Sequence, residues 1–344
     1  MKSATRSFFV RRGAMIRRRA LCQWLAGSGV ALASGVAAQS TARVYRIGEL
    51  EYGRPDNLPA PSLPPPPDVF RPELARLGLV EGVNLVIDVR TAHGDPALLD
   101  AAAAELVATR PDVLFTGSGF VSARALKNAT TTIPIVFSAI GEPVAAGLVA
   151  SLARPGGNLT GGAIPDELEL KRVEILLEVL GASASIAMLT GPIVEGRMNR
   201  IRKQLADRNL HVRFPDVKRS EDLAPAFEQM ARQRIDGLVI ALSPFTGSHT
   251  PEIGELVAKH RFPAIADGLP YLDFGVMIAY SIDWPEVMRK AARTVYRVLM
   301  GARPEDLPIE QVEKFDFVIN LKVAKALGVR IPTSVRVRAT QVIE

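Results

Sequence analysis

The chain has 344 residues, of which 48% are hydrophobic and 23% are charged, with one cysteine and a formal net charge of +6. This length is about twice that of a typical domain of ~150 residues, so we expect two domains with separate cores. The composition is globular and excludes a collagen-like or generally disordered chain. A single cysteine excludes an internal disulfide framework and a cysteine-clustered metal site.

The excess positive charge lies entirely in residues 1–38, which contain seven Lys or Arg residues and no acid. The remaining chain has 35 basic and 36 acidic residues, so the charge does not indicate a nucleic-acid partner. Three arginines at 17–19 precede a mildly apolar, Ala- and Gly-rich stretch that ends in Val36-Ala37-Ala38. This pattern is typical of a secretory signal peptide cleaved near Ala38, with Met15 as an alternative start.

The apolar stretch is too short and too glycine-rich for a membrane anchor of ~20 strongly apolar residues. We therefore expect a periplasmic protein, with the Sec and twin-arginine routes both open. Cys22 lies within the signal, so the mature chain would contain no cysteine.

Beyond Arg43, short β-branched runs alternate with helical segments. In the first half we expect strands at 44–50, 84–90, 112–116 and 133–138. We expect helices at 70–77, 96–109 (capped by Asp95) and 122–129, and a proline-rich loop at 54–68. This alternation is typical of a doubly wound parallel sheet.

A glycine-rich break at 156–162 precedes a second set of similar elements, and we expect the chain to cross between domains there. The predicted helices are 167–180, 198–208, 222–232, 252–260 and 284–300. The predicted strands are 185–190, 211–214, 237–242 and 263–266, followed by a strand–helix unit at 315–328. The expected fold class is α/β, with two Rossmann-like lobes built on parallel sheets.

Residues for catalysis or metal binding are not assigned by any motif. The four histidines, at 93, 211, 249 and 260, are scattered and lack ligand spacing. Thr116-Gly-Ser-Gly119 fits neither the Gly-x-Ser-x-Gly frame of a hydrolase nor a phosphate loop nor a completed dinucleotide motif. We therefore expect no catalytic residue, no metal and no cofactor.

Thr116-Gly-Ser-Gly119 still follows a predicted parallel strand and precedes a helix. Backbone N–H groups and small hydroxyls at such a junction suit a carboxylate. The alternative is an ordinary glycine turn with a capping serine.

Several stretches occur together, in this order, in one known family. The most specific are Gly141–Gly161 and Phe315–Gly328; the others are Gly78–Asn84, Arg110–Leu114, Ile133–Phe137 and Lys171–Leu176. The chain resembles the substrate-binding proteins of ABC importers that group with tryptophan/phenylalanine-binding receptors, which have a type I periplasmic-binding-protein fold.

That resemblance implies two lobes joined by a three-crossing hinge that closes on the ligand. Lobe 1 would comprise 43–159 plus 281–310, and lobe 2 would comprise 160–280 plus 311–344. It also implies a non-enzymatic receptor for a small molecule, an amino acid or an aromatic or carboxylate-like compound, that delivers it to an ABC permease at the inner membrane. We expect a monomer.

An amino acid needs donors for its carboxylate and an acid for its ammonium group. For the carboxylate we expect Ser118 and the Gly119 N–H, with Ser138 assisting. For the ammonium group we expect Asp267, and then Glu142. The other predicted ligand-binding residues are Ser243 and the aromatic candidates Tyr52, Tyr271 and Tyr280.

The chain departs from the family pattern at Glu142, where Asp is usual, and at Gly191-Pro192, where Asn-Pro is usual. The proline-rich segment also shortens a helix that helps to line the cleft, so the ligand of the named relatives is not carried over. Two alternatives stay open: a two-lobed sensor or regulatory ligand-binding protein, and a two-domain Rossmann-type enzyme.

Overall fold

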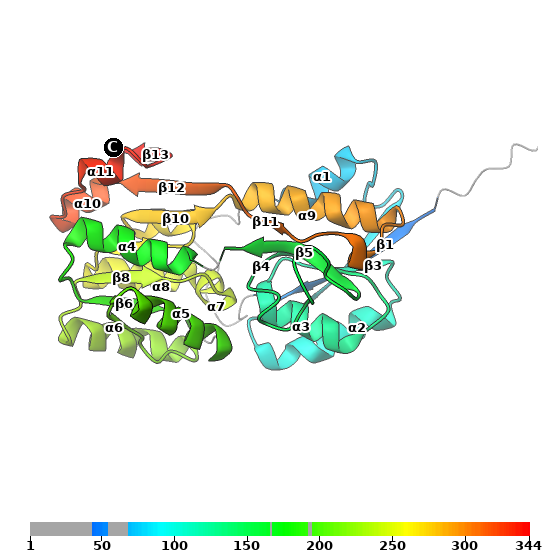
Figure 1. Cartoon of the computed structure of the whole chain (residues 1–344), viewed down its shortest axis with the longest axis horizontal. Helices are drawn as coiled ribbons and strands as arrows, with labels where there is room; N and C mark the ends of the chain where they lie inside the picture. Colours follow the sequence, from blue (N-terminus) through cyan, green and yellow to red (C-terminus); the bar gives the residue numbers. More distant parts are fainter. Residues whose placement is uncertain (1–42, 54–67, 166, 192–194) are drawn as a thin grey trace, which may run out of the picture. The chain divides into compact units, whose positions relative to one another are not determined.

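The computed structural model describes residues 43–53, 68–165, 167–191 and 195–344 (Figure 1). The predicted export signal and most of the proline-rich loop lie outside the described residues. The described chain contains two sheets, each covered by helices on both faces. We call the units built on these sheets the first lobe and the second lobe.

The first lobe has six strands in the order β11-β5-β4-β3-β1-β2, all paired in parallel. The strands are β1 (Tyr45–Glu51), β2 (Leu85–Thr91), β3 (Val113–Thr116), β4 (Ile135–Gly141), β5 (Leu159–Ile164) and β11 (Glu310–Gln311). The helices α1 (Phe70–Arg76) and α9 (Trp284–Leu299) pack on one face. The helices α2 (Leu99–Ala108) and α3 (Gly119–Ala129) pack on the other.

The second lobe has seven strands in the order β13-β12-β10-β9-β8-β6-β7, and only the β10–β12 pair is antiparallel. The strands are β6 (Ile186–Leu189), β7 (Val212–Arg213), β8 (Gly237–Ile240), β9 (Ala264–Ala266), β10 (Ile278–Ile282), β12 (Phe315–Asn320) and β13 (Gln341–Ile343).

Helices cover this second sheet on both sides. One side carries α4 (Leu168–Leu180), α5 (Glu195–Asp207), α10 (Leu321–Leu327) and α11 (Thr333–Arg336). The other side carries α6 (Leu223–Arg232) and α8 (Thr250–His260), with the short α7 (Pro244–Ser248) beside them. The expectation of two α/β lobes with parallel sheets is confirmed.

Short-range chemistry explains why the predicted elements form close to their expected bounds. The Asp95 carboxylate accepts from the Ala97 N–H at 2.9 Å and starts the turn before α2. Asp283 caps α9 in the same way, accepting from the Glu286 N–H at 2.9 Å, and Pro285 occupies the first turn. Asn320 caps α10 through the Val323 N–H at 3.1 Å.

Strand β5 lies where the sequence predicted a crossing between lobes. It contains Gly161 and Gly162 and pairs with β4. A Cβ on Gly161 would lie 2.1 Å from the Phe137 carbonyl oxygen, so the close approach of these strands requires glycine. The first sheet therefore extends to Ile164, and the first connection to the second sheet comes after it, later than the expected boundary at 159.

The chain passes between the two sheets at three places: after β5, between β10 and α9, and between β11 and β12. A small apolar cluster lies around these connections, formed by Ala139, Ile164, Leu168, Ile282 and Val287 with Trp284 and Phe315 packed against it. None of the described helices is long and apolar enough to cross a membrane.

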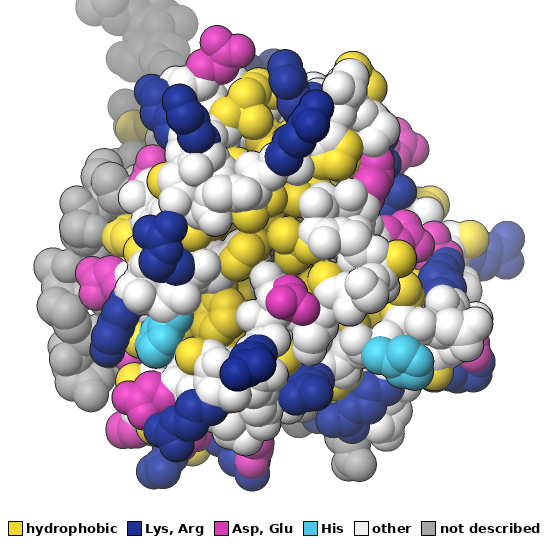
Figure 2. All heavy atoms as spheres, turned by 90° about the vertical axis from the view of Figure 1, so that its left-hand side faces the viewer, with side chains coloured by type: hydrophobic (Ala, Val, Ile, Leu, Met, Phe, Trp, Pro, Cys, Tyr) yellow, Lys and Arg dark blue, Asp and Glu magenta, His cyan; other side chains and the backbone are white. Residues whose placement is uncertain are grey.

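Figure 2 shows the end of the second lobe at which its parallel strands begin. Lys and Arg side chains are spread around this face, acidic and histidine side chains lie between them, and hydrophobic side chains are visible near its middle. The charges on this face are mixed and scattered.

Candidate functional site

The candidate site lies at the carboxyl ends of the parallel strands, where ligands bind in open α/β sheets. In the first lobe, Thr116 ends β3 and Gly117–Gly119 follow it, while Ser138 lies within β4 and Glu142 directly follows that strand. In the second lobe, Ser243 follows β8 and Asp267 follows β9.

At Thr116–Gly119 and Ser138 the first lobe contributes small, neutral groups, several of which already have hydrogen-bond partners. The Thr116 hydroxyl donates to the Leu50 carbonyl at 2.8 Å and accepts from the Ser118 N–H at 3.1 Å. The Ser138 hydroxyl donates to the Gly117 carbonyl at 3.4 Å. These bonds bring the loop at Ser118 and Gly119 next to Ser138 in one wall, and the part these residues play in ligand binding stays a prediction.

Gly119 is the first residue of α3 and has a φ of +78°, in the left-handed region that favours glycine. A Cβ at this position would lie 3.5 Å from Cγ of Pro244, which follows Ser243 in the second lobe. The backbone of the first lobe therefore approaches the start of α7 closely, and the predicted loops at Thr116–Gly119 and Ser243–Pro244 lie together.

Ser243 is 5% exposed and caps the short helix α7. Its hydroxyl accepts from the Thr246 N–H at 3.1 Å, and its own N–H donates to the Thr246 hydroxyl at 3.1 Å. These bonds give Ser243 a local structural role at the site, whatever it contributes to a ligand.

Asp267 is the most unusual of the predicted site residues. Its side chain is 5% exposed, and its Oδ1 atom has no hydrogen-bond partner. Burial raises the pKa of its carboxyl to about 6, while the charges of Arg172 and Arg197 lower it and that of Glu169 raises it. The carboxylate is therefore buried beside charged groups with an acceptor atom unused.

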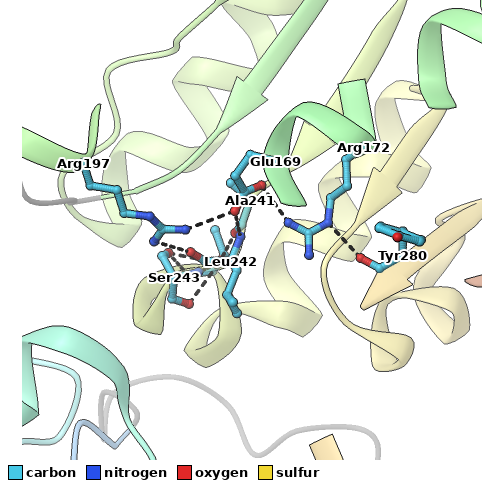
Figure 3. Close-up of polar contacts among 8 residues, drawn as sticks. Glu169, Arg172, Arg197, Ala241, Leu242, Ser243 and Tyr280 are labelled. Atoms are coloured by element: carbon cyan, nitrogen blue, oxygen red, sulfur yellow. Dashed lines mark hydrogen bonds and ion pairs between the residues drawn. The ribbon is translucent and has the colours of Figure 1, made fainter. Parts of the chain in front are cut away.

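Those neighbouring charges form a network at the start of α4 (Figure 3). Arg172 is fully buried and donates from Nη1 to Glu169 Oε2 at 2.7 Å and from Nε to the Tyr280 carbonyl at 2.8 Å. Its Nη2 atom is also buried and has no partner. Figure 3 shows this third nitrogen directed away from both Glu169 and Tyr280.

Arg197 of α5 completes the network from the other side of Glu169. It donates from Nη2 to Glu169 Oε1 at 3.1 Å and from Nη1 to the Leu242 carbonyl at 2.9 Å. The Leu242 N–H also donates to Glu169 Oε1 at 3.1 Å. Both oxygens of Glu169 are thus bonded, and this carboxylate holds two arginines and the end of β8 in fixed positions.

A depression with about 320 Å³ of empty space, open to solvent, lies between this network and the end of β4. Its lining includes Glu142, Glu169 and Arg197. Glu142 has a φ of +54° and forms an ion pair with Arg200 of α5. Glu142 therefore faces an arginine of the second lobe, and this ion pair links the two lobes.

The tyrosines predicted at the site have other surroundings. Tyr52 is 6% exposed and packs in the apolar core of the first lobe. The Tyr280 ring stacks on Phe315 at 5.8 Å and meets Phe317 edge-on at 5.6 Å. The buried Tyr271 hydroxyl donates to the Thr246 carbonyl at 2.6 Å. The structure does not bring these rings together.

Glu169, Arg172 and Arg197 were not predicted as site residues from the sequence. A signal was present, because Arg172 lies at i+4 from Leu168 and i−4 from Leu176, on the apolar face of an amphipathic helix. A charged residue in that stripe predicts a buried, paired side chain. The partner Arg197 and the acid Asp267 are distant in sequence, and only the fold shows that they are neighbours.

The structure also tests for metal binding. Among the described residues, no group of three or more His, Cys, Asp or Glu side chains is arranged to hold a metal ion.

These two lobes, their parallel sheets and the site between the strand ends define a type I periplasmic-binding-protein fold. A solved structure of a conserved domain protein from Vibrio cholerae superposes with a TM-score of 0.76 at 26% identity, covering 87% of this chain and 100% of the other. The ABC domain from Streptococcus pneumonia in complex with L-Trp gives a TM-score of 0.75 at 24% identity, with the same coverage.

The sequence comparisons narrow this class to one family. The family model for "ABC transporter substrate binding protein" matches residues 62–343, so the chain belongs to that family and is a solute-binding receptor. It is also similar to the tyrosine-binding protein of Clostridioides difficile, with 27% identity over 275 residues, which is 78% of each chain.

Proposed function

We propose that the protein is an exported receptor that captures an amino acid between its lobes and delivers it to the permease of an ABC importer. The observation that supports this most directly is the buried Asp267 carboxylate, which has an unused acceptor atom beside an ionic network at the strand ends. A carboxylate without a partner in such a place suits a ligand that carries a cation.

The relatives agree with this ligand class. One is a tyrosine-binding protein by name, and a structural neighbour was solved with L-Trp. The family supplies the general role of solute capture for an ABC transporter. We therefore propose an amino acid, without choosing its side chain.

Binding is tested by thermal denaturation and calorimetry of the purified protein with each proteinogenic amino acid, with sugars as a comparison set. A ligand at about 100 times its Kd adds about 2.7 kcal/mol to the free energy of unfolding. Trp284 lies in the apolar cluster at the connections between the sheets, so its fluorescence provides a second signal. Stabilisation by sugars alone would contradict the proposal.

Export and delivery need separate experiments. We expect the periplasmic form to begin near Gln39, as read by amino-terminal sequencing of protein from a cell fraction. Deletion of the gene should abolish uptake of the radiolabelled amino acid that binds the pure protein. Normal uptake in the deletion strain would instead favour a sensing role.

A further inference from the structure

We infer that the second lobe alone binds both charged ends of the amino acid, with the carboxylate on Arg172 Nη2 and the ammonium group on Asp267 Oδ1. This inference rests on the proposed function and specifies its ligand contacts. It differs from the expectation from sequence, in which the carboxylate lies at Ser118 and Gly119 of the first lobe.

Arg172 and Asp267 each have a side-chain atom whose hydrogen-bonding capacity is unused. Arg172 is fully buried and Asp267 is 5% exposed, yet Arg172 Nη2 and Asp267 Oδ1 have no partner. A buried donor or acceptor without a partner destabilises the folded state, and more so when it is charged. A donor on a cation and an acceptor on an anion, left open together, match a ligand with one negative and one positive group.

Arg172 and Asp267 do not bond to each other, because Arg172 is held in place by other partners. They interact electrostatically, since Arg172 lowers the pKa of Asp267, but no ion pair within 4 Å joins these two described residues. Arg172 is held by its other two nitrogens, on Glu169 and on the Tyr280 carbonyl. Its guanidinium is therefore fixed in place and does not turn to pair with Asp267.

Glu169 and Arg197 are not the primary ligand contacts, because they already bond to other groups of the second lobe. Glu169 accepts from Arg172, Arg197 and the Leu242 N–H, which occupies both of its oxygens. Arg197 donates to Glu169 and to the Leu242 carbonyl. These two residues position Arg172 and the end of β8, which leaves Arg172 and Asp267 to bind the ligand.

The first lobe faces the site with a wall of neutral groups at Ser118, Gly119 and Ser138. The Ser118 N–H already donates to the Thr116 hydroxyl, and Gly119 approaches Pro244 across the site. None of the described residues Thr116, Ser118, Gly119 and Ser138 carries a charged side chain, and the Thr116 and Ser138 hydroxyls already donate to backbone carbonyls. The first lobe then closes over the bound amino acid, and the second lobe recognises its charges.

The test uses L-tyrosine, its carboxamide, which lacks the negative charge, and its deaminated acid, which lacks the ammonium group, with the same set for the tightest amino acid of the binding panel. The wild-type protein should bind the amino acid roughly 10-fold or more tightly than either analogue. Equal binding of all three would overturn the inference and leave amino-acid binding intact. If no amino acid binds, the proposed function fails as well.

Two variants assign each charge to its residue. Asp267→Asn should weaken binding of the amino acid and of the carboxamide roughly 10- to 100-fold, while the deaminated acid binds at least as well as before. Arg172→Lys should weaken binding of the amino acid and of the deaminated acid, and it should leave the affinity for the carboxamide unchanged. A uniform loss for all three ligands would indicate a structural role and overturn the assignment.

Matched controls are available at the opposite edge of the same sheet. Asp236 accepts from the Ser185 N–H at 2.8 Å at the start of β8, and Arg213 donates to Gln233 at 3.2 Å at the lobe's surface. Asp236→Asn and Arg213→Lys should leave all three affinities unchanged. A carboxylate preference that survives Arg172→Lys but is lost in Ser118→Ala would place the carboxylate in the first lobe and refute the inference.

Discussion

The two lobes share one architecture but present opposite chemistry to the site. The first lobe offers mainly neutral hydroxyls and a glycine backbone, at Thr116, Ser118, Gly119 and Ser138, and its charged Glu142 is paired with Arg200. The second offers the buried charges of Glu169, Arg172, Arg197 and Asp267. The same strand–helix scaffold thus supports shape matching in one lobe and charge recognition in the other, because side chains at strand ends vary without altering the sheet.

The largest expected difference between the lobes comes from removing a buried charge. Arg172→Met leaves Asp267 beside Glu169 with one compensating cation fewer, and loss of one partner from a buried pair typically costs about 3–5 kcal/mol. Ser118→Ala in the first lobe should change the free energy of unfolding by about 0.5 kcal/mol or less. Urea denaturation of both variants measures the contrast, and equal effects would contradict it.

Asp267→Asn tests whether the charge of the Asp267 carboxylate destabilises the folded protein when no ligand is bound. The pKa of Asp267 is raised from 3.8 to about 6, so the folded state binds a proton more tightly than the unfolded state. The free energy of unfolding of the wild type therefore falls as the pH rises from about 4 to about 6, by up to about 3 kcal/mol.

The asparagine variant lacks this titration, so at neutral pH it should be more stable than the wild type while binding the amino acid more weakly. Thermal denaturation across this pH range provides the measurement, and Asp236→Asn is the control. A variant that is less stable than the wild type above pH 6 would show that Asp267 supports the fold instead.

Gly119→Ala tests the role of backbone conformation in the first lobe. An alanine at φ +78° is disfavoured by about 1–2 kcal/mol, and its Cβ would contact Pro244 at 3.5 Å. Gly247 of α7 is the control, because a Cβ added there would meet only open space, so Gly247→Ala should be neutral or slightly stabilising. Calorimetry should show a loss of stability only at Gly119.

Glu142→Gln has the smallest expected effect and tests the one ion pair that we describe between the lobes. Glu142 is 8% exposed and its partner Arg200 is 33% exposed, so solvent screens their attraction. The free energy of unfolding should fall by about 1 kcal/mol or less in the variant, and its ligand affinity should fall more in low salt than in high salt. An affinity loss that is independent of salt would exclude an electrostatic contribution to closure.

Local sequence signals predicted most of the fold. The capping residue Asp95, and apolar periodicity in segments such as 168–180, place helices within a few residues of their observed bounds. Strands β5, β10, β11 and β13 were not predicted; β5 contains paired glycines, and β11 and β13 have only two and three residues. Their pairing depends on neighbouring strands, which a local pattern does not include.

The candidate site was predicted in part. The loop around Ser118 and Gly119 and the acid Asp267 lie at strand ends as expected, but Tyr52 packs in a core and Tyr280 packs against Phe315 and Phe317. Glu169, Arg172 and Arg197 were not predicted as site residues. They lie on helices, and their role depends on which of their atoms are left without partners.

The sequence by itself determined the two α/β lobes, the family resemblance and the concentration of excess charge in residues 1–38. Helix caps, strand runs and composition act over a few residues, so they can be interpreted without a fold. The tertiary structure decided which charges meet. It places Asp267, which follows β9, beside Arg172 of α4, nearly a hundred positions earlier, and buries both with one atom of each unpaired. Burial and pairing depend on these long-range neighbours, and they distinguish a ligand contact from a structural ion pair.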